Sequence, residues 1–261
     1  MTGLRERVVQ RATRRYVAGP ALSDALAVAR AGGQPTTLAF WDGPADSPDL
    51  VVAAHEDAIA AIAAGRLDSY LSVKLPAIRD DHRAAGLADL AVQAGVLLHF
   101  DSLAESEAER TLALACRLAA RGAAVGATLP GCWSRSVRDA EPLAAAGVRS
   151  RIVKGQWRGD REPVAGFLAV VDAVERADGR AAIATHDTEL ARAALARLPG
   201  AELELLFGLP SRDVVQAAGP GVAARIYIPY GRGYLPYAVR HTVSHPVTAW
   251  WLARDLALRR R

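Results

Sequence analysis

Short β-rich apolar runs alternate along this chain with longer runs in which apolar residues recur at helical spacing. The short runs predict strands at 37–41, 69–75, 95–101, 124–129, 148–154, 180–185, 202–207 and 224–229. The helical runs predict helices near 22–32, 50–64, 84–93, 104–121, 136–146, 162–177, 187–197, 211–217 and 235–258.

Strand–helix units in this number close a parallel barrel, and no linker or low-complexity segment divides them. We therefore expect an α/β fold, a single (β/α)8 barrel of the TIM type over residues 1–261, with an extra helix before the first strand. The last predicted helix is expected to lie over the site. An open doubly wound sheet is the structural alternative, but such sheets usually contain fewer strands.

Polar residues gather at the carboxyl ends of the predicted strands, where such barrels carry their chemistry. In the second strand Tyr70, Ser72 and Lys74 alternate with apolar residues, so a polar stripe should face the barrel interior. His99 and Asp101 share a face of the third strand. Because Lys74 or Asp101 would be costly to bury alone, the sequence predicts an ion pair between them, with either a structural or a substrate-positioning role.

The end of the predicted fifth strand brings two cations and a glycine to the same edge, in the run RIVKGQW. Arg151 and Lys154 can hold a phosphate or the electron-rich edge of a flat ligand, and Gly155 allows the backbone to approach it closely. Arg151 and Lys154 would point to opposite faces of a regular strand, so one of them is expected to lie at a bend.

A second polar run, Thr185, His186 and Asp187, follows the sixth strand just before a helix. The N-terminus of a helix is a ready site for a phosphate group. Thr and Asp are also common N-cap residues, so simple capping is the alternative interpretation.

The last predicted strand and helix add a polar wall. Arg225, Tyr227 and Pro229 share one side of the strand. The helix presents at i, i+3, i+4 and i+7 the residues Tyr237, Arg240, His241 and Ser244. His241 and His245 have a spacing that can chelate a metal, but no Glu follows His241 and a proline follows His245 directly, so we expect no metal site.

Composition narrows the class of protein. The chain is 51% hydrophobic and 23% charged, and no apolar run reaches the length of about 18 residues that a membrane span needs. The N-terminal run lacks the apolar core of a secretory signal, so we expect a cytoplasmic protein. Cys116 and Cys132 match neither a disulfide framework nor zinc spacing. His55 and His82 are expected at the surface.

The charge is basic, with a formal net charge of +4 and a pI of about 9.4. The arginines are spread over predicted helices and balanced by acids, which favours a solvated surface. A nucleic-acid or membrane-binding module would rest on charge alone. We expect no nucleic-acid partner and at most peripheral membrane contact. Lys74 and Lys154 are the only lysines in the sequence, and both stand at the ends of apolar strands. A compact, titratable ammonium can serve chemistry there that a guanidinium cannot, and chance placement is the alternative interpretation.

The run RIYIPYGRGYLPYAVRHTVSHP, from Arg225 to Pro246, resembles the signature of the proline dehydrogenases. In that family a strand R-x-Y-x-P-x-G precedes a helix Y-x-x-R-R-x-x-E. In the same order as the family, the chain also carries YVAG, SVKL, a strand ending in Asp101, R-x-x-K-G and ATHD, where the family usually has ATHN. Together these motifs span nearly the whole chain.

The resemblance implies a barrel that binds FAD and oxidises proline, or a proline-like cyclic or secondary amine, to an imine by hydride transfer to flavin N5. The electrons would pass on to a quinone or to oxygen. The resemblance implies contacts to the cofactor from Arg151, Lys154, Gly155, Trp157, Thr185, His186 and Asp187. It implies that the substrate pocket is lined by Lys74, Asp101, Tyr227, Tyr237, Arg240 and His241.

The chain also departs from the family. Its paired arginines are Arg240 and His241 here, and the following glutamate is Ser244. Loss of one charge-assisted contact costs about 1.5–3 kcal/mol, which predicts weak binding of free proline unless His241 is protonated or Lys74 compensates. The glutamine that the family places after strand four is Pro130. These departures support the alternative of a barrel that has lost flavin redox chemistry and binds a ligand or performs a non-redox reaction.

Overall fold

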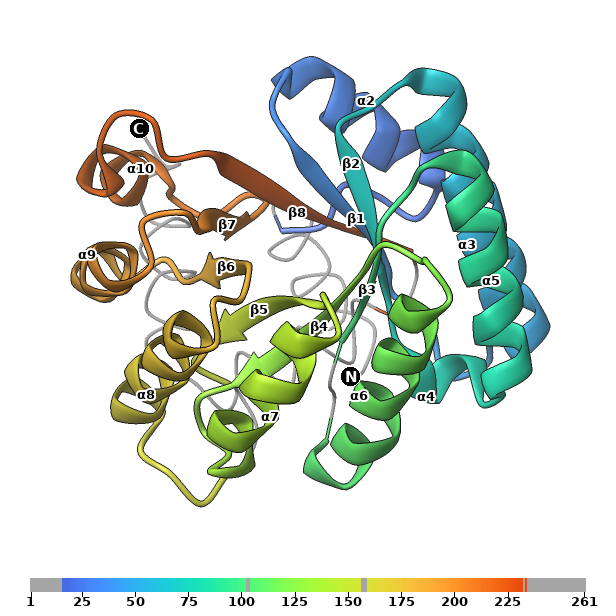
Figure 1. Ribbon diagram of the computed structural model, residues 1–261. Coiled ribbons are helices and arrows are strands. Elements are labelled where there is room, and N and C mark those ends of the chain that lie inside the picture. The colour runs from blue at the N-terminus through green and yellow to red at the C-terminus, as the bar shows by residue number, and fades with distance from the viewer. Residues whose placement is uncertain (1–15, 102–103, 156–158, 232, 234–261) are drawn as a thin grey trace, which may run out of the picture.

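A computed structural model describes residues 16–101, 104–155, 159–231 and 233. The strands are β1 (Thr36–Phe40), β2 (Ser69–Val73), β3 (Leu98–Phe100), β4 (Val125–Pro130), β5 (Arg149–Val153), β6 (Ala181–Ala184), β7 (Glu202–Leu206) and β8 (Ala224–Tyr230). They run parallel in chain order, and β8 pairs with β1 to close a barrel. The predicted (β/α)8 barrel is thus confirmed (Figure 1).

Helices surround the barrel (Figure 1). They are α2 (Leu22–Gly32), α3 (Pro48–Gly65), α4 (Leu75–Ile78), α5 (Asp81–Ala94), α6 (Glu105–Ala120), α7 (Arg135–Ala145), α8 (Pro163–Arg176), α9 (Thr188–Arg197) and α10 (Arg212–Ala218). The extra helix predicted before the first strand is α2, which packs against β8. The predicted last helix, 235–258, lies outside the described residues. In the part of the chain that the structure describes, no helix is both long enough and apolar enough to span a membrane.

Several predicted strands are longer in the sequence pattern than in the structure, the second and the third among them. The second strand ends at Val73 and not at residue 75, because Leu75 and Pro76 begin the short helix α4 with Lys74 at its N-cap. Proline favours the first turn of a helix, where its missing N–H costs nothing. The third strand begins at Leu98 and not at residue 95, because α5 continues to Ala94 and Gly95 closes it at φ 68°.

The strands bury both faces, but the two faces differ in chemistry. Leu71 and Val73 of β2 point outward into the apolar layer beneath the helices, and both are fully buried. Tyr70 and Ser72 point inward and contact charged side chains across the barrel. The polar stripe predicted for this strand is therefore confirmed for Tyr70 and Ser72, whereas Lys74 lies beyond the end of the strand. Most barrels of this type fill the interior with branched apolar residues, whereas this one places ion pairs there.

Candidate active site at the barrel mouth

Asp101, directly after β3, is the centre of the polar cluster at the carboxyl end of the barrel. Its Oδ1 accepts hydrogen bonds from Thr128 Oγ1 at 3.1 Å and from Arg151 Nη1 at 2.5 Å. Its Oδ2 accepts from Ser72 Oγ at 2.5 Å and from Tyr227 Oη at 3.3 Å. Each carboxylate oxygen thus has two donors, contributed by four other strands. The position of this anion is fixed from several sides at once.

Arg151 of β5 lies buried between two carboxylates. Nη1 faces Asp101, and Nη2 lies 2.7 Å from Oε1 of Glu204 on β7. Burial opposes its charge, but Glu204, Tyr70 and Asp101 outweigh burial, and the pKa of Arg151 is raised well above its ordinary value. The guanidinium also lies over the ring of Tyr227, 5.0 Å from its centroid. Arg151 is therefore a permanent cation that its neighbours hold in one orientation.

Lys74, directly after β2, lies at the same end of the barrel. Its Nζ donates to Phe40 O at 3.2 Å and to Asp42 Oδ1 at 3.4 Å, and lies 5.5 Å from the ring centroid of Trp41. Burial lowers the pKa of Lys74, while the charges of Asp42 and Asp101 oppose that shift. The ammonium therefore loses hydration that its carboxylate neighbours only partly replace.

The predicted ion pair between Lys74 and Asp101 is wrong. Lys74 pairs with Asp42, and Asp101 pairs with Arg151. The physical reason is the path of the chain after each strand. Lys74 falls beyond the end of β2 as the N-cap of α4, beside the end of β1, whereas Arg151 lies within β5 and its long side chain crosses the interior. Its forked guanidinium also matches a carboxylate better than an ammonium does.

Lys154 and Gly155 follow the end of β5 at Val153, so Lys154 lies beyond the regular strand that contains Arg151. Lys154 is partly exposed and its Nζ lies 3.6 Å from Asp187 Oδ2. Gly155 has φ +89°, and a Cβ at this position would overlap Cys132 Sγ. The close backbone approach that this glycine permits is thus made to Cys132, in the loop after β4.

Thr185, His186 and Asp187 are held by contacts within the chain. Thr185 Oγ1 accepts from Asp187 N at 3.1 Å, and Asp187 Oδ1 accepts from Leu190 N at 3.1 Å as the N-cap of α9. The capping interpretation of Thr185 and Asp187 accounts for these contacts.

His186 connects the end of β6 to the segment after β7. Its Nδ1 lies 3.0 Å from Pro210 O, and its Nε2 lies 2.9 Å from Leu206 N. These two partners require Nδ1 to carry the proton and Nε2 to accept. Burial lowers the pKa of His186, although the bond to Pro210 opposes that shift. A neutral imidazole in one tautomer therefore joins the two loops.

Other predicted site residues, Trp157, Tyr237, Arg240 and His241, lie outside the described residues, as does His245. The prediction of a surface position for His55 is wrong. His55 is buried on α3, with Nδ1 2.6 Å from Val51 O, because α3 turns this position toward Phe40 and the barrel wall.

Two acidic residues of the site were not predicted from the sequence. Asp42 pairs with Lys74, and Glu204 pairs with Arg151. For Glu204 the sequence did contain an indication, the alternation of acids and leucines in β7, which we did not use. In β7, Glu202 and Glu204 alternate with leucines, which is the same pattern that places Tyr70 and Ser72 inside the barrel. Asp42 follows β1 in a loop, and no periodicity marks it.

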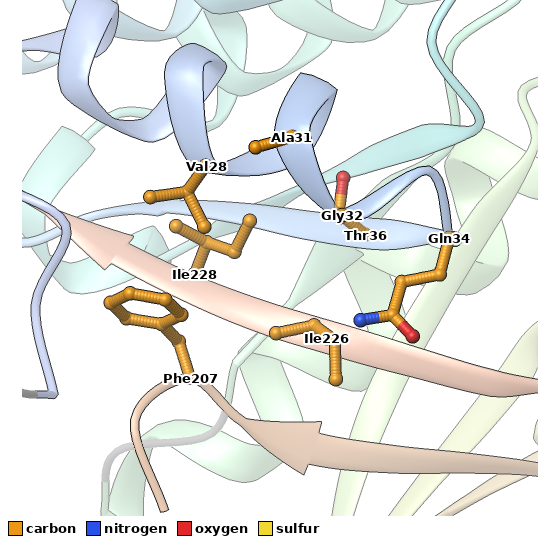
Figure 2. Close-up of a pocket in the computed structure, with 8 residues that line it drawn as sticks. All are labelled: Val28, Ala31, Gly32, Gln34, Thr36, Phe207, Ile226 and Ile228. Atoms are coloured by element: carbon orange, nitrogen blue, oxygen red, sulfur yellow. The ribbon is translucent and has the colours of Figure 1, made fainter.

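A groove elsewhere on the molecule has a different character. Figure 2 shows Val28 and Ala31 of α2 beside Ile226 and Ile228 of β8, with Phe207 nearby. The groove lies outside the barrel wall, and apart from Gln34 and Thr36 its side chains are apolar. It offers none of the convergent charges that surround Asp101.

Fold and site together define the chain as a closed (β/α)8 barrel whose polar residues converge at the carboxyl ends of the strands, where enzymes of this architecture carry their active sites. No protein-family model matches the chain. Two curated proteins named proline dehydrogenase 1 are similar to it along nearly their whole length. The one from Bacillus subtilis subsp. natto is 25% identical over 93% of this chain and 90% of its own. The one from Bacillus subtilis strain 168 is 24% identical over the same shares.

Solved structures of proline utilization A share the fold. The protein from Bdellovibrio bacteriovorus, inactivated by N-propargylglycine, matches 92% of this chain with a TM-score of 0.81 and 15% identity. A variant from Bradyrhizobium japonicum matches 88% of it with a TM-score of 0.74 and 17% identity. The matched regions span about a third of those longer chains, 33% and 30% respectively. The resemblance to proline dehydrogenases is thus confirmed, and the low identity marks this chain as a divergent relative.

Proposed function

We propose that this protein is an FAD-dependent dehydrogenase that oxidises proline, or a proline-like cyclic or secondary amine, to an imine. The observation that carries the proposal is the convergence of Lys74, Asp101, Arg151 and Tyr227 at one barrel mouth. These are the motif residues that the resemblance to proline dehydrogenases assigns to the site. The similarity to two curated proline dehydrogenases over almost the full chain supports the same chemistry.

The residues present fit a flavin. The Nε of Arg151 is buried and has no hydrogen-bond partner among the described residues, so a donor remains for an acceptor atom of a ligand. Lys154 is a partly exposed cation on the rim beside it. Arg151 and Lys154 would hold the isoalloxazine, with Gly155 beside them and Thr185, His186 and Asp187 forming the rim toward the nucleotide. Trp157 is assigned to this group by its motif position. FAD supplies the hydride acceptor at N5 when it is bound.

On the substrate side, cationic residues and tyrosine rings have different roles. Lys74 provides a cation for the carboxylate of an amino acid, together with the motif residues Arg240 and His241. Tyr227 and the motif residue Tyr237 contribute ring surfaces to the pocket. Hydride loss requires a neutral amine held at the correct distance from the acceptor. Because Asp101 already accepts from four donors, it positions Arg151 and Tyr227 and does not serve as the base. The amine therefore loses its proton to a group other than Asp101 or to solvent.

The test begins with the colour of the purified full chain. We expect visible flavin absorbance at near-stoichiometric occupancy, with FAD and not FMN released on denaturation. Anaerobic titration with proline, hydroxyproline and prolyl derivatives then ranks substrates by bleaching of that absorbance. Reoxidation by a soluble quinone or by oxygen identifies the electron acceptor. A colourless protein that cannot be reconstituted with FAD would overturn the proposal in favour of a barrel without redox chemistry.

A further inference from the structure

We propose that Glu204 of β7 is a positioning residue for this reaction, which holds the Arg151 guanidinium in place and sets the charge beside the flavin. The inference rests on the proposed function. It concerns a residue that lies outside every motif of the resemblance.

Glu204 is anchored from three directions. Its Oε1 accepts from Thr37 Oγ1 at 3.1 Å and lies 2.7 Å from Arg151 Nη2, and its Oε2 accepts from Tyr70 Oη. The side chain is only 2% exposed. The donors come from β1, β2 and β5, so strands on several sides of the barrel fix one carboxylate. A buried carboxylate with this many partners remains ionised and has little freedom to move.

Glu204 and Asp101 bind opposite ends of the same guanidinium. Nη1 of Arg151 faces Asp101 and Nη2 faces Glu204, so the planar group cannot turn without breaking one of the two pairs. The Nε of Arg151 is then left as the donor without a partner among the described residues. The direction of that donor follows from the position of Glu204.

Glu204 also changes the charge of the cluster. The three groups Asp101, Arg151 and Glu204 together carry one negative charge, and Arg149, which is paired with Glu202, acts on Glu204 from farther away. Buried charges are weakly screened, so this excess acts on any group bound at the mouth. Reduction adds electron density to a flavin, and a neighbouring negative charge opposes it. Removal of the Glu204 charge should therefore make the bound FAD easier to reduce.

The chain provides a matched control on the same strand. Glu202 lies two residues earlier on the same face of β7 and pairs with Arg149 and with Arg225, the latter at 2.9 Å. It belongs to the opposite, amino-terminal end of the barrel. Among the described residues its carboxylate pairs with these two arginines and with neither Asp101 nor Arg151. Its partner Arg149 donates to Tyr70, which donates to Glu204, so a substitution at Glu202 reaches Glu204 only through two intervening side chains. It disturbs a comparable ion pair and leaves the direct ion pairs of Arg151 in place.

The experiment compares the midpoint potential of bound FAD in the wild type, Glu204→Gln, Glu204→Asp and Glu202→Gln. We expect a higher potential in Glu204→Gln, and values near that of the wild type in Glu204→Asp, which keeps the charge, and in Glu202→Gln. A merely structural role would lower thermal stability but would not distinguish loss of charge from shortening of the side chain. An unchanged potential in Glu204→Gln, or an equal shift in Glu202→Gln, would overturn the inference.

A second measurement needs no flavin. Nitrogen NMR of the arginine side chains, with the Arg151 signal identified by its loss in Arg151→Lys, reports rotation of the guanidinium in the flavin-free protein. We expect slow rotation in the wild type and faster rotation in Glu204→Gln and in Tyr70→Phe, which removes a donor to Glu204 without changing charge. Equal rotation in all three would overturn the inference. If the wild type takes up no FAD, the proposed function fails, and this measurement still decides whether Glu204 holds Arg151.

Discussion

The ammonium of Lys74 lies 3.4 Å from a carboxylate oxygen of Asp42, at the ends of two neighbouring strands, while Asp101 is bound by Arg151. Asp42 is 31% exposed, whereas Lys74 is 16% exposed, so water can still solvate the carboxylate if the ammonium is removed. Lys74 is thus a cation that the fold does not need for neutralising a buried acid.

Lys74→Met is expected to leave the free energy of unfolding unchanged or raised by about 1 kcal/mol, because it removes the desolvation cost of a largely buried ammonium. The KM for proline should rise by about 10–100-fold, since a charge-assisted hydrogen bond contributes about 1.5–3 kcal/mol. Urea unfolding and steady-state kinetics measure the two effects. Arg117→Met, which removes an exposed cation of α6 that pairs with Asp81, is the control and should leave KM near the wild-type value. A wild-type KM in Lys74→Met would place Lys74 outside the substrate pocket.

Asp101→Asn is expected to destabilise the fold by about 3 kcal/mol, because an amide nitrogen would face donors that now point at a carboxylate oxygen. The value lies at the low end of the range for broken buried pairs, since Glu204 still neutralises Arg151. Turnover should fall by about 100-fold, because Arg151 and Tyr227 both lose their alignment. Chemical denaturation and single-turnover flavin reduction report the two quantities. Asp42→Asn should retain stability within about 1 kcal/mol. Full turnover in a folded Asp101→Asn protein would contradict the positioning role.

Gly155→Ala should destabilise the protein by about 2–4 kcal/mol, since an alanine at φ +89° is strained and its Cβ would overlap Cys132 Sγ. The double variant Gly155→Ala/Cys132→Ala removes the overlap but retains the backbone strain. Its cost should therefore be smaller than the sum of the two single costs, by about 1–3 kcal/mol. Thermal unfolding of all four proteins completes the cycle. Strict additivity would show that the loop after β5 moves away from Cys132 freely.

Acid should destabilise the protein before any carboxylate is protonated. Burial lowers the pKa of His55, His99 and His186, and for His99 the charges of Arg151 and Arg149 lower it further, well below 6.5. Below that value the unfolded chain binds protons that the folded chain does not, so stability decreases as pH falls. Each histidine contributes a slope of at most about 1.4 kcal/mol per pH unit.

The carboxylate contribution belongs to a lower pH range. Burial opposes the charge of Glu204, but Arg151 and Tyr70 outweigh it and lower its pKa from 4.5, so the stability that it contributes is complete above that value and is lost only as pH falls further. Urea unfolding between about pH 7.5 and pH 5 isolates the histidines. His99→Gln should reduce the slope of the free energy of unfolding against pH in this range by the contribution of one proton. An unchanged slope would mean that His99 is protonated in the folded protein.

The sequence by itself determined the order and the faces of the strands. Alternation in β2 predicted that Tyr70 and Ser72 face inward, because the direction of a side chain along a strand is a local property of the backbone. The same local logic applied to Glu204 in β7, although we did not use it. The cap at Asp187 could also be predicted, since it depends on residues close in sequence.

Only the tertiary structure decided which charges meet. Lys74 and Asp101 lie at the ends of neighbouring strands, yet each pairs with a different residue. Closure of the barrel brings Arg151 and its second partner Glu204 across the interior toward Asp101. The loop after β1 brings Asp42 beside Lys74. A buried ion pair depends on distance in space and on the geometry of both groups. Neither is encoded by spacing along the chain, and this is why the strand pattern could be predicted while the ion pairs at the mouth could not.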